Sequence, residues 1–232
     1  MRRPMLLATI VAAAAVLGAG SSGAAGPDPS GFSAKVDNPW FPLEPGTTYS
    51  YRGVKDGKPS RDVVTVTGQT VRIDGVPCVA VRDLLYESGR LAERTTDWYT
   101  QDRKGNVWYF GEATAELDAN GHVKSTEGSW RAGVDGAKPG IFVPADPKVG
   151  QTGQQEYYGG HAEDHFQVLS LHARVKVAFV SSANALLTKE WTPLEPDVLD
   201  HKFYVRGVGL VLEQSVKGPK ERNELVDVRH SS

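Results

Sequence analysis

The sequence predicts an all-β protein: one strongly curved antiparallel sheet that forms a closed or half-open barrel of meandering hairpins. Turn-forming residues recur about every 15 residues through the first two thirds of the chain, as hairpins require. The segments between these turns are rich in Val, Thr, Tyr and Trp, which favour strands. No segment has the apolar period of a long amphipathic helix. A sheet of about ten or more strands tends to curl or to split, so a β-sandwich is the alternative.

Five turn signals divide the first half of the chain into strands. Asn120-Gly121 fits a type I′ turn, because that turn needs positive φ at both central residues. Between the signals, the predicted strands are 62–67, 76–81, 96–101 and 107–110. The signals themselves are Lys55-Asp56-Gly57, Asp74-Gly75, Glu87-Ser88-Gly89, Arg103-Lys104-Gly105-Asn106 and Asn120-Gly121.

Glycine and proline crowd residues 129–153, which predicts a long loop or a crossover there. Strand patterns then resume and continue almost to the last residue. The later predicted strands are 154–158, 164–171, 174–180, 186–191, 202–205, 210–216 and 224–228.

The first residues have the features of a secretory signal peptide. Arg2 and Arg3 precede an uncharged apolar run at 5–17 and a small-residue stretch at 18–25, the usual order of a cleavable signal. The apolar run is shorter than the ~20 residues that a membrane-spanning helix needs. We therefore expect a secreted, extracellular protein. Its parts are a signal peptide at 1–25, an extended leader at 26–37, a single β domain at 38–229 and a tail at 230–232.

Charge and cysteine content narrow the possible partners. Loss of Arg2 and Arg3 with the signal lowers Lys+Arg from 26 to 24 against 28 Asp+Glu, a net charge of −4. This charge argues against a nucleic-acid partner, which requires a basic patch. Cys78 is the single cysteine, so no internal disulfide can form. No cysteine lies at the cleavage point, so we expect no lipid modification and no stable membrane anchor after cleavage.

Several stretches resemble an uncharacterised family of exported bacterial β-rich proteins. The resemblance spans nearly all of the mature chain and implies an exported β domain, but it transfers no catalytic residue. Some relatives are lipoproteins, and this chain differs from them in lacking the required cysteine. The stretches that carry the resemblance are Asn38-Pro39-Trp40-Phe41-Pro42-Leu43, Pro45-Gly46-Thr47, Asp97-Trp98-Tyr99-Thr100-Gln101-Asp102, Gly105-Asn106-Val107-Trp108-Tyr109-Phe110-Gly111-Glu112, Ser125-Thr126-Glu127-Gly128-Ser129-Trp130, Glu190-Trp191-Thr192-Pro193-Leu194-Glu195-Pro196 and Gly207-Val208-Gly209-Leu210-Val211.

A group of His and Glu residues is the candidate metal site. Glu163 and His165 are two residues apart, so in a strand they share one face with Cα atoms roughly 6.6 Å apart. Further ligands would come from His172, Glu190 or His201 on the strands that follow. A mixed His/carboxylate site suits Zn²⁺ or another divalent transition metal. The alternative is that these are solvated side chains on the polar face of a strand, since their spacing matches no zinc motif.

An acidic and aromatic group is the candidate ligand pocket. Aromatic rings beside carboxylates are typical of carbohydrate sites, and rings inside an open barrel can line a pocket for an apolar ligand. The alternative is that the rings fill the core. The candidate pocket residues are Trp98, Tyr99, Trp108, Tyr109, Glu112 and Trp130.

No sequence signature identifies a reaction. Gly-x-Ser-x-Gly is absent, and Cys78 has apolar neighbours and no base near it in sequence. The first hypothesis is therefore an exported binding protein that holds a small apolar ligand, a lipid or a metal ion. The alternatives are a metal-dependent enzyme that uses the His/carboxylate site, and a cell-envelope interaction protein that uses residues 129–153 as its contact surface.

Overall fold

The computed structural model describes residues 28–231, and their regular structure is almost entirely β-strand. One 3-10 helix, η1 (Pro29–Gly31), precedes the strands. The signal peptide predicted at residues 1–25 lies outside the described residues. In chain order the strands are β1 (Phe32–Ser33), β2 (Thr47–Lys55), β3 (Lys58–Ile73), β4 (Val76–Glu87), β5 (Arg90–Asp102), β6 (Val107–Leu117), β7 (Val123–Ser125), β8 (Trp130–Arg131), β9 (Lys138–Val143), β10 (Thr152–Gln154), β11 (Glu156–Tyr157), β12 (His165–Lys176), β13 (Ser181–Trp191), β14 (Leu199–Val205), β15 (Gly209–Lys217) and β16 (Arg222–His230).

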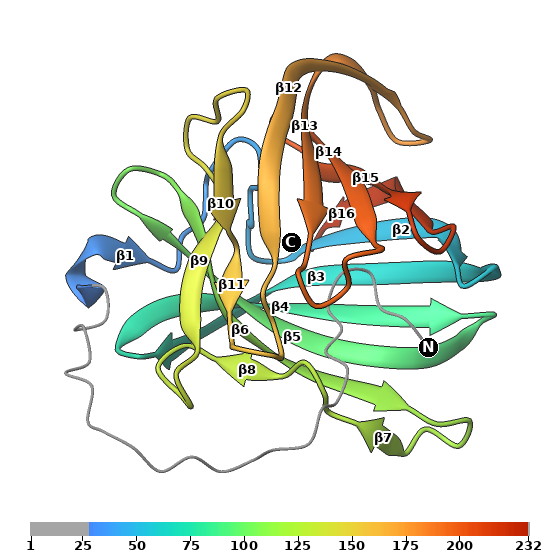
Figure 1. Cartoon of the computed structure of the whole chain (residues 1–232), viewed down its shortest axis with the longest axis horizontal. Helices are drawn as coiled ribbons and strands as arrows, with labels where there is room; N and C mark the ends of the chain where they lie inside the picture. The colour runs from blue at the N-terminus through green and yellow to red at the C-terminus, as the bar shows by residue number, and fades with distance from the viewer. Residues whose placement is uncertain (1–27, 232) are drawn as a thin grey trace.

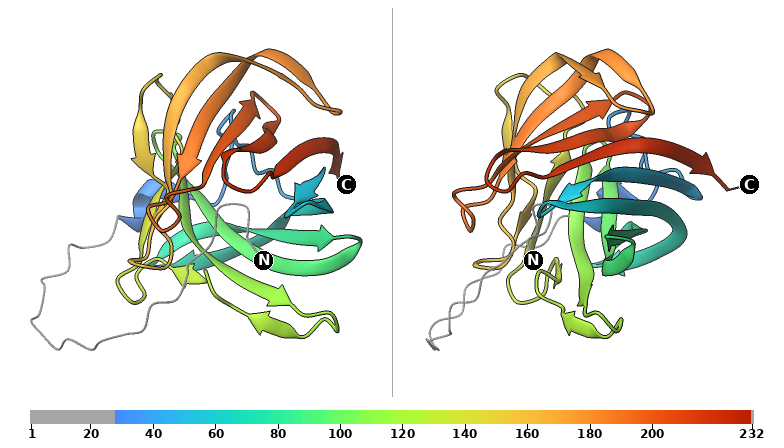
Figure 2. Two further views of the ribbon diagram at one scale, coloured as in Figure 1. Left: turned by 45° about the vertical axis from the view of Figure 1, so that its right-hand side comes forward. Right: turned by 90° about the vertical axis from the view of Figure 1, so that its right-hand side faces the viewer.

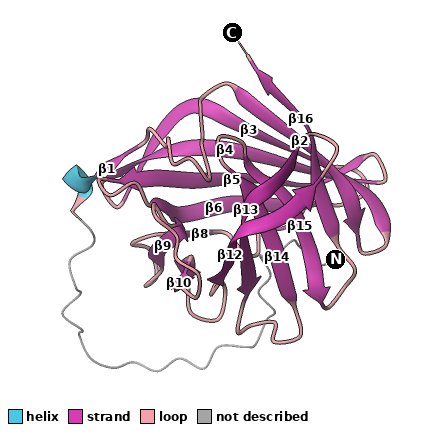
Figure 3. Cartoon of the chain, turned by 90° about the horizontal axis from the view of Figure 1, so that it is seen from above, coloured by secondary structure: helices cyan, strands magenta, loops and turns pink. Residues whose placement is uncertain are grey.

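The strands form a nearly closed antiparallel barrel, which confirms the predicted fold class. Thirteen of them follow one path in the order β10-β12-β13-β14-β15-β16-β2-β3-β4-β5-β6-β9-β11 (Figure 1). The turned views of Figure 2 show the sheet curling round on itself. Seen from above, β3 to β6 form one wall and β12 to β15 another (Figure 3). No helix within residues 28–231 has the length and apolar character to span a bilayer.

The first and last long strands of the barrel pair with each other. Strands β2 and β16 run antiparallel in a register that places Val54 opposite Arg222 and Thr47 opposite His230. Gly53 allows the close approach of these strands, because a Cβ at this position would overlap the Arg222 carbonyl oxygen. This ladder joins segments about as far apart in sequence as the domain allows.

The two ends of the strand path meet in one short stretch of chain. Strand β10 pairs with β12, strand β11 pairs with β9, and only Gln155 separates β10 from β11. The Gln155 amide donates a 2.7 Å hydrogen bond to the Asp164 carbonyl, and its side-chain Nε2 donates to the Phe142 carbonyl at 3.3 Å. The seam of the barrel is therefore crossed by the backbone itself.

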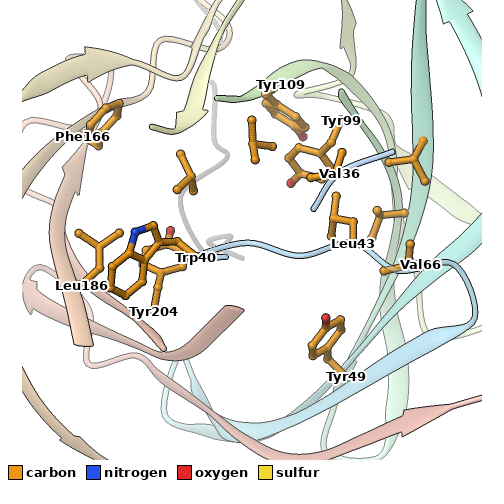
Figure 4. Close-up of a cluster of buried hydrophobic side chains, with 14 of the residues drawn as sticks. Val36, Trp40, Leu43, Tyr49, Val66, Tyr99, Tyr109, Phe166, Leu186 and Tyr204 are labelled. Carbon is orange, nitrogen blue, oxygen red and sulfur yellow. The ribbon is translucent and has the colours of Figure 1, made fainter. Parts of the chain in front are cut away.

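The segment before β2 lies inside the barrel. Val36 pairs with Leu43 in an isolated bridge, and both are buried, as is Trp40. Figure 4 shows Trp40 beside Leu186 and Tyr204 in the interior. The predicted leader at 26–37 therefore includes residues that pack in the core and, in β1, pair with β5.

Three local predictions were wrong. The predicted strand 174–180 ends early, because β12 stops at Lys176 and β13 begins only at Ser181. Residues 129–153 are not one long loop, because they contain β8 and β9, and β9 is a wall strand paired with β6. The turn at Asn120 is not type I′, since Gly121 has a φ of +84° whereas Asn120 keeps a negative φ. Asp118 instead shapes this turn, because its Oδ1 accepts hydrogen bonds from the amides of Asn120 and His122.

Candidate functional site

The barrel contains a partly open cavity of about 160 Å³, which we call the interior cavity. This volume is roughly ten times what a single water molecule requires. Aromatic and carboxyl side chains from opposite walls dominate its lining. Its aromatic residues are Phe41, Tyr51, Tyr99, Tyr109 and Phe142.

Six acidic residues line the interior cavity, and we call them the carboxyl belt. They come from widely separated parts of the chain, because each occupies an inward position on or beside a different strand. The belt consists of Asp62 (β3), Asp83 (β4), Asp97 (β5), Glu156 (β11), Asp164 (before β12) and Glu213 (β15).

Asp62 and Asp83 form a hydrogen-bonded carboxyl pair on neighbouring strands. Burial, together with the nearby Asp62 charge, raises the pKa of Asp83 well above its usual range. Burial also raises the pKa of Asp62, although the hydrogen bond from Asp83 opposes this shift. One oxygen of each residue, Oδ1, is buried without a hydrogen-bond partner.

A β-bulge aligns the next group of polar atoms. Between β5 and β6 the register shifts, with Asp97 opposite Glu112 and Tyr99 opposite Tyr109, so β6 carries an extra residue at Phe110-Gly111. The bulge brings Tyr109 and Glu112 onto the same face although they are three residues apart. The Tyr109 hydroxyl donates to Asp97 Oδ1 at 2.7 Å and lies 3.3 Å from Glu112 Oε2.

Glu156 is the most deeply buried member of the belt, with 1% of its surface exposed. Its Oε2 accepts a 2.7 Å hydrogen bond from the Trp130 indole, while its Oε1 has no partner. Burial, with the charges of Asp164 and Glu112 adding to it, raises its pKa well above the usual range. The site therefore contains a carboxyl group that is held in place but only half satisfied.

Lys202 is the single cationic residue among those that line the interior cavity. Its Nζ lies 3.0 Å from Glu190 Oε2 and 3.7 Å from Glu213 Oε1. Burial alone lowers the pKa of Lys202, but the charges of Glu190 and Glu213 outweigh it and raise this pKa well above its usual range. Lys202 is therefore charged and already paired, and it neutralises only a small part of the belt.

The belt makes the stability of the fold depend on pH. Burial raises the pKa of Asp97 to about 7, of Asp164 to about 8 and of Glu213 to about 7. In the unfolded chain these pKa values are about 4, so between pH ~4 and ~8 the folded state binds more protons than the unfolded state. The free energy of unfolding must therefore fall as the pH rises through this range.

We expect the free energy of unfolding in urea to be higher at pH 5 than at pH 8 by at least ~1.4 kcal/mol, the value of one proton over one pH unit. The Asp97→Asn variant removes one of the titrating groups and should show a shallower dependence. A free energy of unfolding that is constant or rises from pH 5 to pH 8 would contradict the raised pKa values.

The six predicted pocket residues do not line one cavity. Tyr99 and Tyr109 line the interior cavity. Trp98, Glu112 and Trp130 line a different cavity, of about 280 Å³. The sixth residue, Trp108, donates its indole N–H to Asp102 Oδ2 at 2.9 Å and packs against the Phe32 ring.

Two of the five predicted metal ligands, Glu190 and His172, each contact another side chain at 3.0 Å. Glu190 is in the interior, where it binds Lys202. His172 is exposed, and its Nδ1 lies 3.0 Å from Asn184 Oδ1.

The remaining three predicted ligands have separate surroundings. His165 stacks on Trp191, and Glu163 accepts a hydrogen bond from the Gly160 amide. His201 lies opposite Lys189 in the register of β13 and β14, one position away from the inward-facing Asp200 and Lys202. Within residues 28–231, no three His, Cys, Asp or Glu side chains are close enough together to hold a metal ion.

Most of the carboxyl belt was not identified from the sequence. Asp97 stands in one of the stretches that carry the family resemblance, but neither it nor Asp62, Asp83 or Glu213 is among the predicted site residues. A usable signal did exist, because Asp is depleted in strands and each of these acids lies within a strand segment. An acidic residue within a Val-rich strand is therefore itself a signal of a functional site.

The fold and the cavity together define a β-barrel with an acidic, aromatic interior, and two solved structures resemble it in fold. One is an inferred exported protein with a YmcC-like fold from Bacteroides fragilis, 14% identical with a TM-score of 0.48, covering 82% of this chain and 98% of the other. The second is an inferred lipoprotein from Parabacteroides distasonis, 10% identical with a TM-score of 0.44 and the same coverage. No family model and no curated protein matches the chain.

Proposed function

We propose that this protein is an exported binding protein whose barrel holds a small organic cation, such as a protonated amine, in the interior cavity. The observation that carries the proposal is the excess of carboxyl groups: six line the cavity, against one lysine. The sequence suggested an apolar ligand, a lipid or a metal ion. The acidic lining favours a charged organic molecule over these.

The belt has capacity for a positive charge that the protein does not itself supply. Lys202 is engaged by Glu190 and Glu213. Asp62, Asp83 and Glu156 each keep one buried oxygen without a hydrogen-bond partner. Burying an unpaired carboxylate costs several kcal/mol, so an ammonium group that donates hydrogen bonds to these oxygens would be stabilised strongly.

The aromatic walls favour an organic cation over a simple ion. The rings of Tyr99 and Tyr109 stack with their centroids 4.9 Å apart, and the centroid of the Phe142 ring lies 5.1 Å from that of Tyr99. Ring faces attract ammonium groups, and their apolar surface covers an alkyl chain. A divalent metal ion would instead need three or more ligands around one point, an arrangement not found among residues 28–231.

The test compares n-butylammonium with n-butanol, its neutral counterpart, by isothermal titration calorimetry at pH 8. At this pH the belt is more ionised than at neutral pH while the amine remains protonated. We expect n-butylammonium to bind and n-butanol to bind at least tenfold more weakly. Equal binding of the two compounds would support an apolar pocket, and no binding of n-butylammonium would refute the proposal.

Variants separate the interior site from general surface charge. Asp97→Asn and Glu156→Gln each remove one ionisable carboxyl group of the belt while keeping an oxygen that accepts the hydrogen bond of Tyr109 or Trp130. Each should weaken n-butylammonium binding about tenfold. The control is Asp146→Asn, which removes an exposed charge and should leave the affinity unchanged.

A further inference from the structure

A second, smaller cavity adjoins the interior cavity. It has a volume of about 30 Å³ and shares Asp62, Glu213 and Asn223 with the interior cavity as lining residues. The shared wall is ordered by hydrogen bonding, since Asn223 Nδ2 donates to Asp62 Oδ2 at 3.3 Å. The two cavities are therefore neighbouring compartments on either side of one polar partition.

The smaller cavity has acidic residues of its own. Asp200 and Glu221 line it, and neither lines the interior cavity. Asp200 is 4% exposed, and its Oδ1 has no hydrogen-bond partner although its carboxyl group hydrogen-bonds Ser215. Glu221 Oε1 is likewise buried without a partner. A buried acceptor that remains unsatisfied is costly, which indicates a binding group that the chain does not provide.

The cations near this cavity leave room for another positive group. Arg222 also lines the cavity, but its guanidinium is already engaged by Glu224 Oε2 at 2.7 Å and Gln214 Oε1 at 3.1 Å. Lys55 is the other cation in the lining, and its charge acts on both Asp62 and Glu221. Four carboxyl groups, those of Asp62, Asp200, Glu213 and Glu221, therefore line the cavity with two cations, of which Arg222 is already paired. The volume of about 30 Å³ exceeds the space for one water molecule, and an ammonium group is of similar size.

From this arrangement we propose that the ligand is a diamine, with one ammonium group in the carboxyl belt and the second beside Asp200 and Glu221, joined by a short alkyl chain that passes Asp62, Glu213 and Asn223. This inference rests on the proposed function and names the class of cation. The two acidic compartments match two separated positive charges.

The test compares 1,4-diaminobutane with n-butylammonium, which lacks the second ammonium group, by calorimetry on the full mature chain. We expect 1,4-diaminobutane to bind at least tenfold more tightly. Asp200→Asn should remove this advantage and leave the n-butylammonium affinity of the wild type. Glu221→Gln is the second variant, with the same expected result, and thermal unfolding of each variant checks that it folds.

The outcomes separate the two proposals. If n-butylammonium binds and 1,4-diaminobutane binds no more tightly, the diamine inference is overturned while the cation site remains. The inference also fails if Asp200→Asn and Glu221→Gln, both folded, weaken the two ligands equally. If neither compound binds, the proposed function itself fails.

Discussion

Replacing Lys202 with methionine is expected to lower the free energy of unfolding by about 3–5 kcal/mol at pH 7, the usual cost of removing one partner from a buried ion pair. The Lys202 side chain is 12% exposed and that of Glu190 is 2% exposed, so water cannot replace the lost charge. Urea unfolding measures the change. In the Lys202→Met/Glu190→Gln double variant, much of the stability should return because the orphaned carboxylate is removed.

An exposed ion pair provides the control for this prediction. Lys35 pairs with Asp37 at 3.1 Å, but their side chains are 80% and 60% exposed, so Lys35→Met should cost less than ~1 kcal/mol. If Lys202→Met costs no more than Lys35→Met, burial does not strengthen the Lys202–Glu190 pair as we expect. A folded Lys202→Met protein should also bind n-butylammonium more tightly, because the competing charge is gone.

Replacing Gly111 with alanine is expected to cost about 3 kcal/mol, because it combines backbone strain with steric overlap. Gly111 has a φ of +131°, which side-chain-bearing residues rarely adopt. A Cβ there would overlap the backbone carbonyl of Trp130, and backbone cannot rotate away as a side chain can. Thermal and urea unfolding measure the loss.

A second glycine within a strand, Gly68, tests whether the bulge causes the loss of stability expected for Gly111→Ala. Gly68 in β3 has no positive φ, and a Cβ on it would meet nothing within 4 Å. Gly68→Ala should therefore be neutral or stabilise the fold by up to ~1 kcal/mol through the unfolded state. A Gly111→Ala protein as stable as Gly68→Ala would mean that the β5–β6 bulge relaxes without cost.

The barrel fold was predictable because the sequence signals for its hairpins lie close together along the chain. Each hairpin has turn residues and alternating strand residues within about 20 positions of one another, and the alternation reports one buried face. The segment 129–153 was misread because its glycines and prolines obscured β9. Strand order at the seam and the β2–β16 ladder depend on pairing between distant segments, for which the local pattern has no signal.

The candidate site was less predictable, because a two-residue period divides a strand into two faces without showing which is inside. Tyr99 faces the interior cavity while Trp98 lines the other cavity, and the sequence treats them alike. The bulge at Gly111 then reverses the alternation, so Glu112 joins the face of Tyr109.

Register limits the prediction of the metal ligands in the same way. His165 is opposite Trp191 in the β12–β13 ladder, so Glu190, one residue earlier, belongs to the other face. A one-residue difference in pairing cannot be read from either strand alone. The proposed cation site uses Glu190 as the partner of Lys202 instead.

The pairing of β2 with β16 determines when the barrel can finish folding. The β2–β3, β3–β4, β4–β5 and β5–β6 hairpins form between neighbours in sequence, so they can assemble as soon as their residues are available. The edge of β2 stays unpaired until residues 222–230 form β16 and pair with it. Until then, the free N–H and C=O groups of β2 can pair with other chains. The slowest step of folding should therefore be this last ladder, and the protein is most prone to aggregate just before it forms.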